Sequence, residues 1–319
     1  MVRFRCWSTL AILMAAVSRA DAQVSEPHEL TDGYYPAFCS SAAFPSPTFR
    51  LVIFREKKRE SSVEVPLGFD LLNYSPDGSA LYVLSKTKHD RSNTPSLHSA
   101  CISRISLNPI QIGRPFCVPG LGAVFAFTTS ADGQRMIVSG QIKDDHGARC
   151  GVFAIRLLDG ATRQILSAED KTACKTENSW ISISMSPSAD LAVAVRHNRL
   201  ELLNFTQRTT TAIADGILRA AWSPDGNWIA AVRLRGGTQL ISAANLQTKR
   251  TLADSLGEWS PDSRFLLGFK ACFFPIAVNG VGTLTALDIA TGKSITFANS
   301  RCKVTAPGTA GWVSMAANH

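Results

Sequence analysis

The 319-residue chain lacks the short motifs that mark several large enzyme classes. It contains no G-x-S-x-G nucleophile elbow, no H-E-x-x-H zinc motif, no G-x-x-x-x-G-K-S/T phosphate loop and no G-x-G-x-x-G dinucleotide turn. These absences exclude the enzyme classes that depend on such motifs. No other residue pattern by itself predicts catalysis, so we expect a protein that is not an enzyme and has no cofactor.

Two further kinds of binding site also lack their usual sequence signal. No two cysteines have the C-x-x-C spacing of a structural zinc site. Basic and aromatic residues do not alternate as they do on nucleic-acid-binding surfaces, so we expect no nucleic-acid partner. The net charge of +8 is basic. We therefore expect the partner to be a protein or an anionic component of the cell envelope.

Long apolar runs are missing, except for a short one near the N-terminus. Arg3 and Arg5 precede the apolar residues 10–17, which are followed by Ala20-Asp21-Ala22. This order predicts a secretory signal peptide, residues 1–22. A membrane anchor is the alternative, but the apolar run is far shorter than the roughly 20 residues that span a bilayer. We expect a periplasmic or secreted protein with no transmembrane segment after signal cleavage.

One short phrase occurs five times in the rest of the chain. Its copies are Tyr74-Ser75-Pro76-Asp77-Gly78, Thr129-Ser130-Ala131-Asp132-Gly133, Met185-Ser186-Pro187-Ser188-Ala189-Asp190, Trp222-Ser223-Pro224-Asp225-Gly226 and Trp259-Ser260-Pro261-Asp262-Ser263. Their first Ser residues lie 55, 56, 37 and 37 positions apart, and a short apolar run follows each copy. Asp accepts hydrogen bonds from nearby backbone N–H groups and Gly adopts positive φ, so each copy predicts a turn. A four-stranded unit that recurs in this way is typical of a β-propeller.

The repeat units and the chain ends together predict how the propeller closes. Five units cover about residues 67–118, 119–172, 173–216, 217–254 and 255–308. Gly311-Trp312-Val313 resembles the first strand of a unit, and residues 48–54 and 62–65 read as a hairpin. We therefore expect one all-β domain, residues 23–319, folded as a six-bladed β-propeller. Its last blade would combine residues 309–319 with 30–66 and so cover sheet edges that would otherwise be unpaired.

The fourth copy carries a family resemblance. Trp222-Ser223-Pro224-Asp225-Gly226, followed by Trp228-Ile229-Ala230-Ala231-Val232, resembles the WD40-like PD40 repeat of TolB-type six-bladed propellers. The resemblance covers about residues 66–315 and implies the architecture. It implies no single activity, because these repeats occur in periplasmic scaffold proteins and beside the hydrolase domain of prolyl oligopeptidase-like peptidases. The sequence has no room for TolB's separate α/β domain and shows no hydrolase domain, so the repeats do not imply a role in the Tol-Pal system.

Seven cysteines follow the predicted signal peptide, an odd number for an oxidising compartment. Three pairs bracket the later strands of units one, two and five. We expect disulfides between Cys101 and Cys117, Cys150 and Cys174, and Cys272 and Cys302. Cys39 would then be unpaired. Free buried thiols are the alternative.

Enlarged connections between the second and third strands of units one, two and five form the candidate binding surface. They cover residues 86–100, 141–149 and 270–281, and they share one face because successive connections alternate between the two faces of a propeller. The candidate binding residues on or near this face are Lys88, His89, Arg91, His98, Asp144, Asp145, His146, Arg196, His197, Arg233, Arg235, Phe273 and Phe274. We expect an exported scaffold that binds a protein or ligand there. An ordinary solvated charged surface is the alternative.

The histidines of these connections leave an enzymatic alternative open. Convergence of His89, His98 and His146 with carboxylates at the channel mouth would favour an extracellular propeller hydrolase or lyase. Their spacing matches no recognised metal motif, so we expect no metal site. Phe273 and Phe274 form either an exposed protein contact or a buried strand or plug.

Four tryptophans recur near the repeated phrase or the C-terminus. Trp180, Trp222, Trp259 and Trp312 all fall at the predicted end of a unit's first strand. They are expected to pack between blades rather than to line a sugar-binding tunnel, because large rings dominate burial in β-sheet cores.

Overall fold

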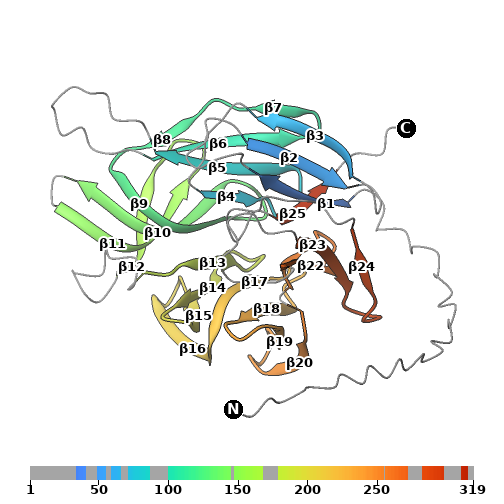
Figure 1. Ribbon diagram of the computed structural model, residues 1–319. Helices are drawn as coiled ribbons and strands as arrows, with labels where there is room; N and C mark the ends of the chain where they lie inside the picture. The colour runs from blue at the N-terminus through green and yellow to red at the C-terminus, as the bar shows by residue number, and fades with distance from the viewer. Residues whose placement is uncertain are drawn as a thin grey trace, which may run out of the picture.

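Antiparallel β-strands form all the regular structure in the residues that the computed structural model describes. These are residues 34–40, 49–54, 59–65, 71–86, 100–144, 147–167, 179–254, 256–271, 282–297 and 310–314. Within this part of the chain, no helix is long and apolar enough to cross a membrane. The sheets stand around a common centre (Figure 1), which is the arrangement of a β-propeller. The predicted all-β propeller fold is confirmed.

Six sheets are formed by the described residues, and five of them use strands that follow one another along the chain. The first contains β4 (Leu71–Tyr74), β5 (Ala80–Lys86), β6 (Ala100–Leu107), β7 (Ile110–Ile112) and β8 (Phe116–Val118). The second contains β9 (Leu121–Thr129), β10 (Arg135–Asp144), β11 (Gly147–Arg156) and β12 (Thr162–Ser167). The third contains β13 (Ser182–Met185), β14 (Leu191–Arg196), β15 (Arg199–Asn204) and β16 (Thr209–Asp215).

The fourth sheet contains β17 (Ile217–Trp222), β18 (Trp228–Arg233), β19 (Thr238–Ser242) and β20 (Thr248–Leu252). The fifth contains β21 (Leu256–Trp259), β22 (Phe265–Ala271), β23 (Gly282–Asp288) and β24 (Ser294–Thr296). In these five sheets the first strand lies nearest the centre. We label the successive strands of a sheet A to D, from the centre outward. In the first sheet, β7 and β8 both pair with β6 and share position D.

The remaining sheet joins the two ends of the chain. Its order is β25-β1-β2-β3, with β25 (Ala310–Ser314), β1 (Tyr34–Ser40), β2 (Phe49–Phe54) and β3 (Arg59–Val65). Trp312 pairs with Pro36 in antiparallel register, and Ala37 pairs with Ile53. The C-terminal strand therefore occupies the A position of a sheet whose other strands come from the N-terminal region.

Hydrogen bonds near the centre connect neighbouring sheets. Asn73 Nδ2 of the first sheet donates to the carbonyl of Phe127 in the second (2.7 Å), and the N–H of Trp222 in the fourth donates to Ser184 Oγ in the third (2.9 Å). The indole Nε1 of Trp259 donates to the carbonyl of Ala221 (3.1 Å), and that of Trp312 to the carbonyl of Glu258 (3.2 Å). The N–H of Ser314 donates to the carbonyl of Gly78 (2.8 Å). Strands β9 and β13 also pack against each other. The A strands thus hold one another in place around the centre.

The repeated phrase is a hydrogen-bonded turn between strands A and B. In the fourth copy, Ser223 Oγ accepts the N–H of Trp228 at 2.9 Å and donates to Asp225 Oδ1. Asp225 Oδ1 also accepts the N–H of Asn227 at 3.0 Å. Gly226 closes the turn at φ +80°, a conformation that L-residues rarely adopt. The recurrence of Ser, Asp and Gly therefore has a structural cause.

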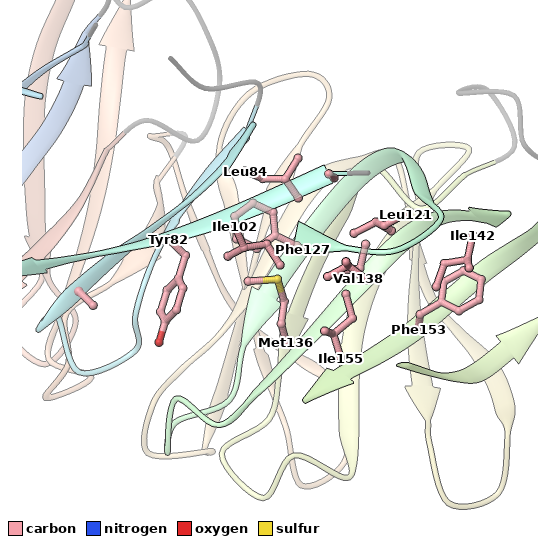
Figure 2. Packing of buried hydrophobic residues seen from close by; sticks show 13 residues of the cluster. Tyr82, Leu84, Ile102, Leu121, Phe127, Met136, Val138, Ile142, Phe153 and Ile155 are labelled. Atoms are coloured by element: carbon pink, nitrogen blue, oxygen red, sulfur yellow. The ribbon is translucent and has the colours of Figure 1, made fainter. Parts of the chain in front are cut away.

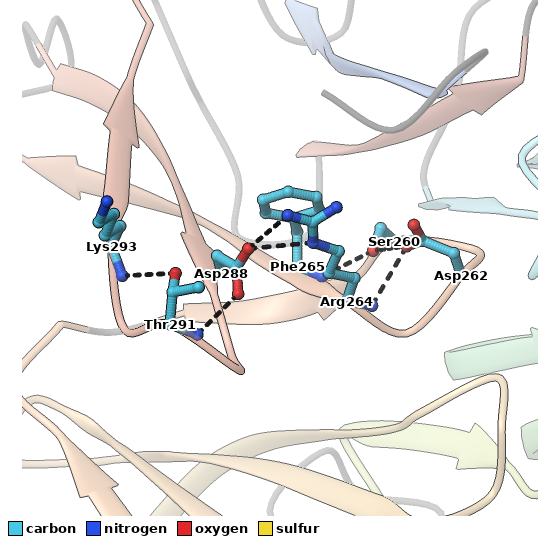
Figure 3. Close-up of polar contacts among 7 residues, drawn as sticks. All are labelled: Ser260, Asp262, Arg264, Phe265, Asp288, Thr291 and Lys293. Carbon is cyan, nitrogen blue, oxygen red and sulfur yellow. Dashed lines mark hydrogen bonds and ion pairs between the residues drawn. The ribbon is translucent and has the colours of Figure 1, made fainter. Parts of the chain in front are cut away.

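The fifth copy shows how this turn joins its neighbour on the same side of the propeller (Figure 3). Arg264, which follows the turn, donates from Nε to Asp288 Oδ2 at 3.0 Å. Asp288 Oδ1 accepts the N–H of Thr291 at 2.9 Å, within the turn between β23 and β24. The A–B and C–D turns thus lie on one side of the sheet, as expected for a four-stranded meander.

Apolar side chains fill the space between adjacent sheets. Figure 2 shows Leu84 and Ile102 of the first sheet close to Phe127, Met136 and Val138 of the second. Met136 and Val138 are fully buried. B strands are apolar on both faces because each sheet is covered on both sides, and this explains why they read as nearly continuous apolar runs.

The disulfide predicted between Cys101 and Cys117 is present. The two residues are direct partners in the register of β6 and β8. Cys150 is also disulfide-bonded. Its predicted partner, Cys174, lies outside the described residues, as do Cys272 and Cys302.

Two local expectations are wrong. The B–C connection expected over residues 141–149 is much shorter, because β10 and β11 remain paired as far as Asp144 and Gly147 and make a long hairpin. Trp180 does not end an A strand, because β13 begins after it. The indole of Trp180 instead donates to Glu201 Oε2 at 2.7 Å.

Candidate functional site

A cavity of about 510 Å³ lies at the centre, between the A strands. Its lining residues come from β4, β9, β13, β17 and β21, with Val232 of β18, Trp312 of β25 and the adjoining A–B turns. Such a volume falls within the roughly 300–1,000 Å³ of small-molecule pockets. The cavity is therefore large enough for a small ligand.

The wall of this cavity is largely apolar. Leu71, Phe125, Ile181, Ile183 and Leu218 contribute aliphatic and aromatic surface. Ser and Thr side chains make up most of the polar remainder. Among the described residues, Arg219 and Glu258 are the two charged members of the lining.

Arg219 and Glu258 form an ion pair across neighbouring A strands. The Nη1 of Arg219 lies 2.9 Å from Glu258 Oε1. Only 26% of the Arg219 side chain and 31% of the Glu258 side chain are exposed. Both residues line the cavity, so the exposed part of each side chain faces the cavity.

Two strand irregularities accompany the ion pair. The register of β17 shifts between Ile217 and Arg219, and the register of β21 shifts between Leu256 and Glu258. Such bulges change the direction of the following side chain and are frequent beside functional sites. Gly257 leaves room for the guanidinium, because a Cβ there would lie 3.0 Å from Arg219 Nε.

The carboxyl of Glu258 has an altered pKa. Burial raises this pKa above its usual range by disfavouring the charged form, and the nearby Arg219 guanidinium offsets the rise only in part. A carboxyl with such a pKa in a cavity is a candidate functional group.

Three of the four tryptophans line the cavity and also pack between sheets. Trp222, Trp259 and Trp312 are each at most 8% exposed. Trp222 belongs to an apolar cluster between the third and fourth sheets, and Trp259 to one between the fourth and fifth. Packing between blades is therefore their main role, as predicted, and their ring edges complete the cavity wall.

One mouth of the cavity opens toward the B–C rim. We define this rim as the side where strand B of a sheet connects to strand C; its described connections are residues 197–198 and 234–237. Ile181, just before β13, and Leu218, near the start of β17, lie on this side and are 43% and 40% exposed. Leu234 is 52% exposed. Its N–H donates to the carbonyl of Gly216, two residues before Leu218.

The structure places some of the predicted binding residues on this rim. Arg233 and Arg235 are exposed on either side of Leu234. His197 adopts φ +51° in the turn between β14 and β15. Arg196 has a structural role, because it pairs with Glu201 at 3.1 Å and its guanidinium lies 4.6 Å from the centre of the Trp180 ring.

The other predicted binding residues fall in parts of the chain that the structure does not describe, apart from Asp144. Lys88, His89, Arg91, His98, Asp145, His146, Phe273 and Phe274 lie outside the described residues, and Asp144 is described only as the end of β10. Convergence of the three histidines therefore remains a prediction. Among the described residues, no group of three His, Cys, Asp or Glu side chains could hold a metal ion.

Sequence reasoning missed Arg219 and Glu258. Each is a single charge within an apolar A strand that ends in Trp222 or Trp259. That pattern was the available signal, since a charge on a strand covered on both faces requires a partner or a ligand.

Comparisons with known proteins support the fold alone. No family model and no curated protein matches the chain significantly. A solved structure assigned as a 6-phosphogluconolactonase, from Bacteroides fragilis, has a TM-score of 0.51 and 13% identity, over 89% of this chain and 99% of that one. One assigned as TolB, from Agrobacterium tumefaciens, has a TM-score of 0.49 and 16% identity, over 83% and 88%. Hydrazine synthase of Kuenenia stuttgartiensis has a TM-score of 0.44 and 14% identity, over 70% and 64%.

Proposed function

We propose that this protein is an exported six-bladed propeller that binds a protein partner on its B–C rim. The six sheets would be the blades, and the sheet of β25 with β1–β3 would close the ring. The pairing of Trp312 with Pro36 and the hydrogen bond from Ser314 to Gly78 support this closure. The apolar run of residues 10–17 supports export.

The exposed turn between β18 and β19 carries the proposal. It places Leu234, 52% exposed, between the exposed Arg233 and Arg235. Gly236 and Gly237 adopt φ near +83° and +82°, and the N–H of Arg233 donates to the carbonyl of Gly237 at 2.9 Å. The turn is thus held by its own backbone bonds, so its three outward side chains are presented with little loss of entropy on binding.

The chemistry of this turn indicates the kind of partner. An exposed apolar side chain flanked by cations matches a protein surface that has an apolar contact and acidic residues around it. Ile181 and Leu218 would extend the apolar contact toward the mouth of the cavity. The enlarged connections expected in blades one, two and five would supply further contacts.

A rim variant tests this proposal. The mature protein, without residues 1–22, would be immobilised and exposed to envelope extract, and the captured proteins quantified under non-reducing conditions. A triple variant should capture at least roughly tenfold less of the specific partner, because apolar contact and charge attraction are both lost. It combines Arg233→Glu, Leu234→Ser and Arg235→Glu. Binding of the purified partner should show the same loss.

Leu158→Ser is the matched control. Leu158 is 90% exposed but lies in the C–D turn of the second sheet, on the opposite side. This variant should capture the partner as well as the wild type. The proposal fails if the rim variant still captures the partner and has the thermal stability of the wild type. It also fails if the wild type captures an anionic glycan and no protein.

A further inference from the structure

The central cavity holds one ion pair in a wall whose other described residues are uncharged. This pair leaves part of the guanidinium available to a carboxylate. Arg219 contacts Glu258 through Nη1 alone, at 2.9 Å. The guanidinium has five donors in a planar fork that suits two oxygens of one carboxylate. Among the described residues, Arg219 Nε and Nη2 have no hydrogen-bond partner. A ligand carboxylate is thus able to use more donors of Arg219 than Glu258 does, and so to compete with Glu258 for the guanidinium.

Apolar residues lie on both sides of this pair along the A strands. Leu218 precedes Arg219 in the bulged part of β17, and Ile181 lies just before β13, the neighbouring A strand. Trp259 follows Glu258 and is 8% exposed. A ligand held by Arg219 would therefore place the rest of its body against aliphatic and aromatic surface.

We propose that the cavity binds a small monocarboxylate with an apolar body, whose carboxylate replaces Glu258 on Arg219 while Glu258 takes up one proton from solvent. The charge in the cavity is then unchanged: one guanidinium faces one carboxylate before and after binding. The inference is independent of the proposed partner on the B–C rim, because it concerns the residues inside the cavity.

Burial supports the proton uptake. It raises the pKa of Glu258, so the neutral acid forms more readily than in water. Arg219, from β17, is the charged group that faces Glu258. The other elements packed against β21, namely β18, β22 and β25, contribute no charged side chain to the cavity wall in the described residues.

Ligand titrations of the mature protein test the inference. Phenylacetate, 4-phenylbutyrate and octanoate are the probes, and 4-phenylbutyramide and 4-phenylbutylamine are the uncharged and cationic controls. Tryptophan fluorescence reports binding, because Trp222, Trp259 and Trp312 line the cavity. Calorimetry in buffers of different ionisation enthalpy counts the protons.

We expect at least one carboxylate to bind with uptake of one proton, and the amide and amine to bind at least roughly tenfold more weakly. Affinity should fall up to about tenfold per pH unit above the pKa of Glu258. Glu258→Gln should bind the carboxylate without proton uptake and with no such pH dependence. Arg219→Gln should lose the preference for carboxylate over amide.

Arg199→Gln is the matched control. It breaks an exposed Arg199–Asp215 pair, 2.8 Å apart, that does not line the cavity. This variant should bind as the wild type does. The inference is overturned if no carboxylate binds, if the amide binds equally well, or if proton uptake persists in Glu258→Gln. Far-UV and near-UV circular dichroism of each variant ensures that these outcomes concern folded protein.

Discussion

Ser223→Ala is expected to destabilise the protein far more than its small size suggests. Ser223 is fully buried, and its Oγ accepts the N–H of Trp228 and donates to Asp225. An unpaired buried N–H costs about 1–3 kcal/mol, and loss of a hydrogen bond to a charged group costs about 1.5–3 kcal/mol. Asp225 keeps its bonds from Asn227. We therefore expect the free energy of unfolding to fall by about 2–4 kcal/mol.

The third copy of the phrase provides a matched variant in the same protein. Ser186 Oγ lies 3.1 Å from Ser188 Oγ, where the other copies have Asp, and it accepts the N–H of Leu191 at 3.3 Å. Both interactions are neutral and longer. Ser186→Ala should therefore cost only about 1 kcal/mol.

Equilibrium unfolding in urea measures both effects. The two variants should keep the wild-type slope, because the surface exposed on unfolding is the same, and should differ in midpoint. Equal losses for Ser223→Ala and Ser186→Ala would refute the assignment of the extra stability to Asp225. A loss below about 1 kcal/mol for Ser223→Ala would refute the role of the turn itself.

Three further predictions concern other parts of the molecule. Burial raises the pKa of Glu258, so its contribution to stability is present below its ordinary pKa of 4.5 and is lost as pH rises through the higher folded value. Urea unfolding at several pH values should therefore show wild-type stability falling relative to Glu258→Gln over that interval, and parallel curves would contradict this. Replacing Cys101 and Cys117 by Ala should cost about 3 kcal/mol, because the bond joins residues 16 positions apart; unchanged stability in oxidised samples would contradict it. Gly78→Ala should lower the melting temperature more than Gly216→Ala. Both have positive φ, but a Cβ at Gly78 would lie 2.9 Å from the backbone N of Ser314, whereas Gly216 has no atom within 4 Å; equal melting temperatures would show that the contact between the chain ends adds nothing.

Local chemistry explains which features the sequence revealed. The repeated Ser, Asp and Gly predict turns because their hydrogen bonds and φ values are formed within six residues. Cys101 and Cys117 were recognisable because they lie in strands of the same sheet that pair with one another. Trp312 indicated an A strand because the same residue ends other A strands.

Trp180 shows the limit of that reasoning. It is the same residue type as Trp222, but it lies six residues before Ser186, whereas Trp222 directly precedes Ser223. It therefore lies before β13 and donates to Glu201. Residues 141–149 show the same limit, because a charged and glycine-containing segment continues as a paired hairpin once β10 and β11 are in register. Tertiary pairing overrides local preference in both segments.

The sequence by itself determined the class of fold and the position of its turns, since these depend on residues close together in the chain. The tertiary structure alone brought Arg219 to Glu258, 39 residues later, because that contact needs two neighbouring A strands and a bulge in each. It also decided that the charge of Glu258 is costly, because the desolvation that raises its pKa comes from surrounding sheets and has no trace in the local sequence.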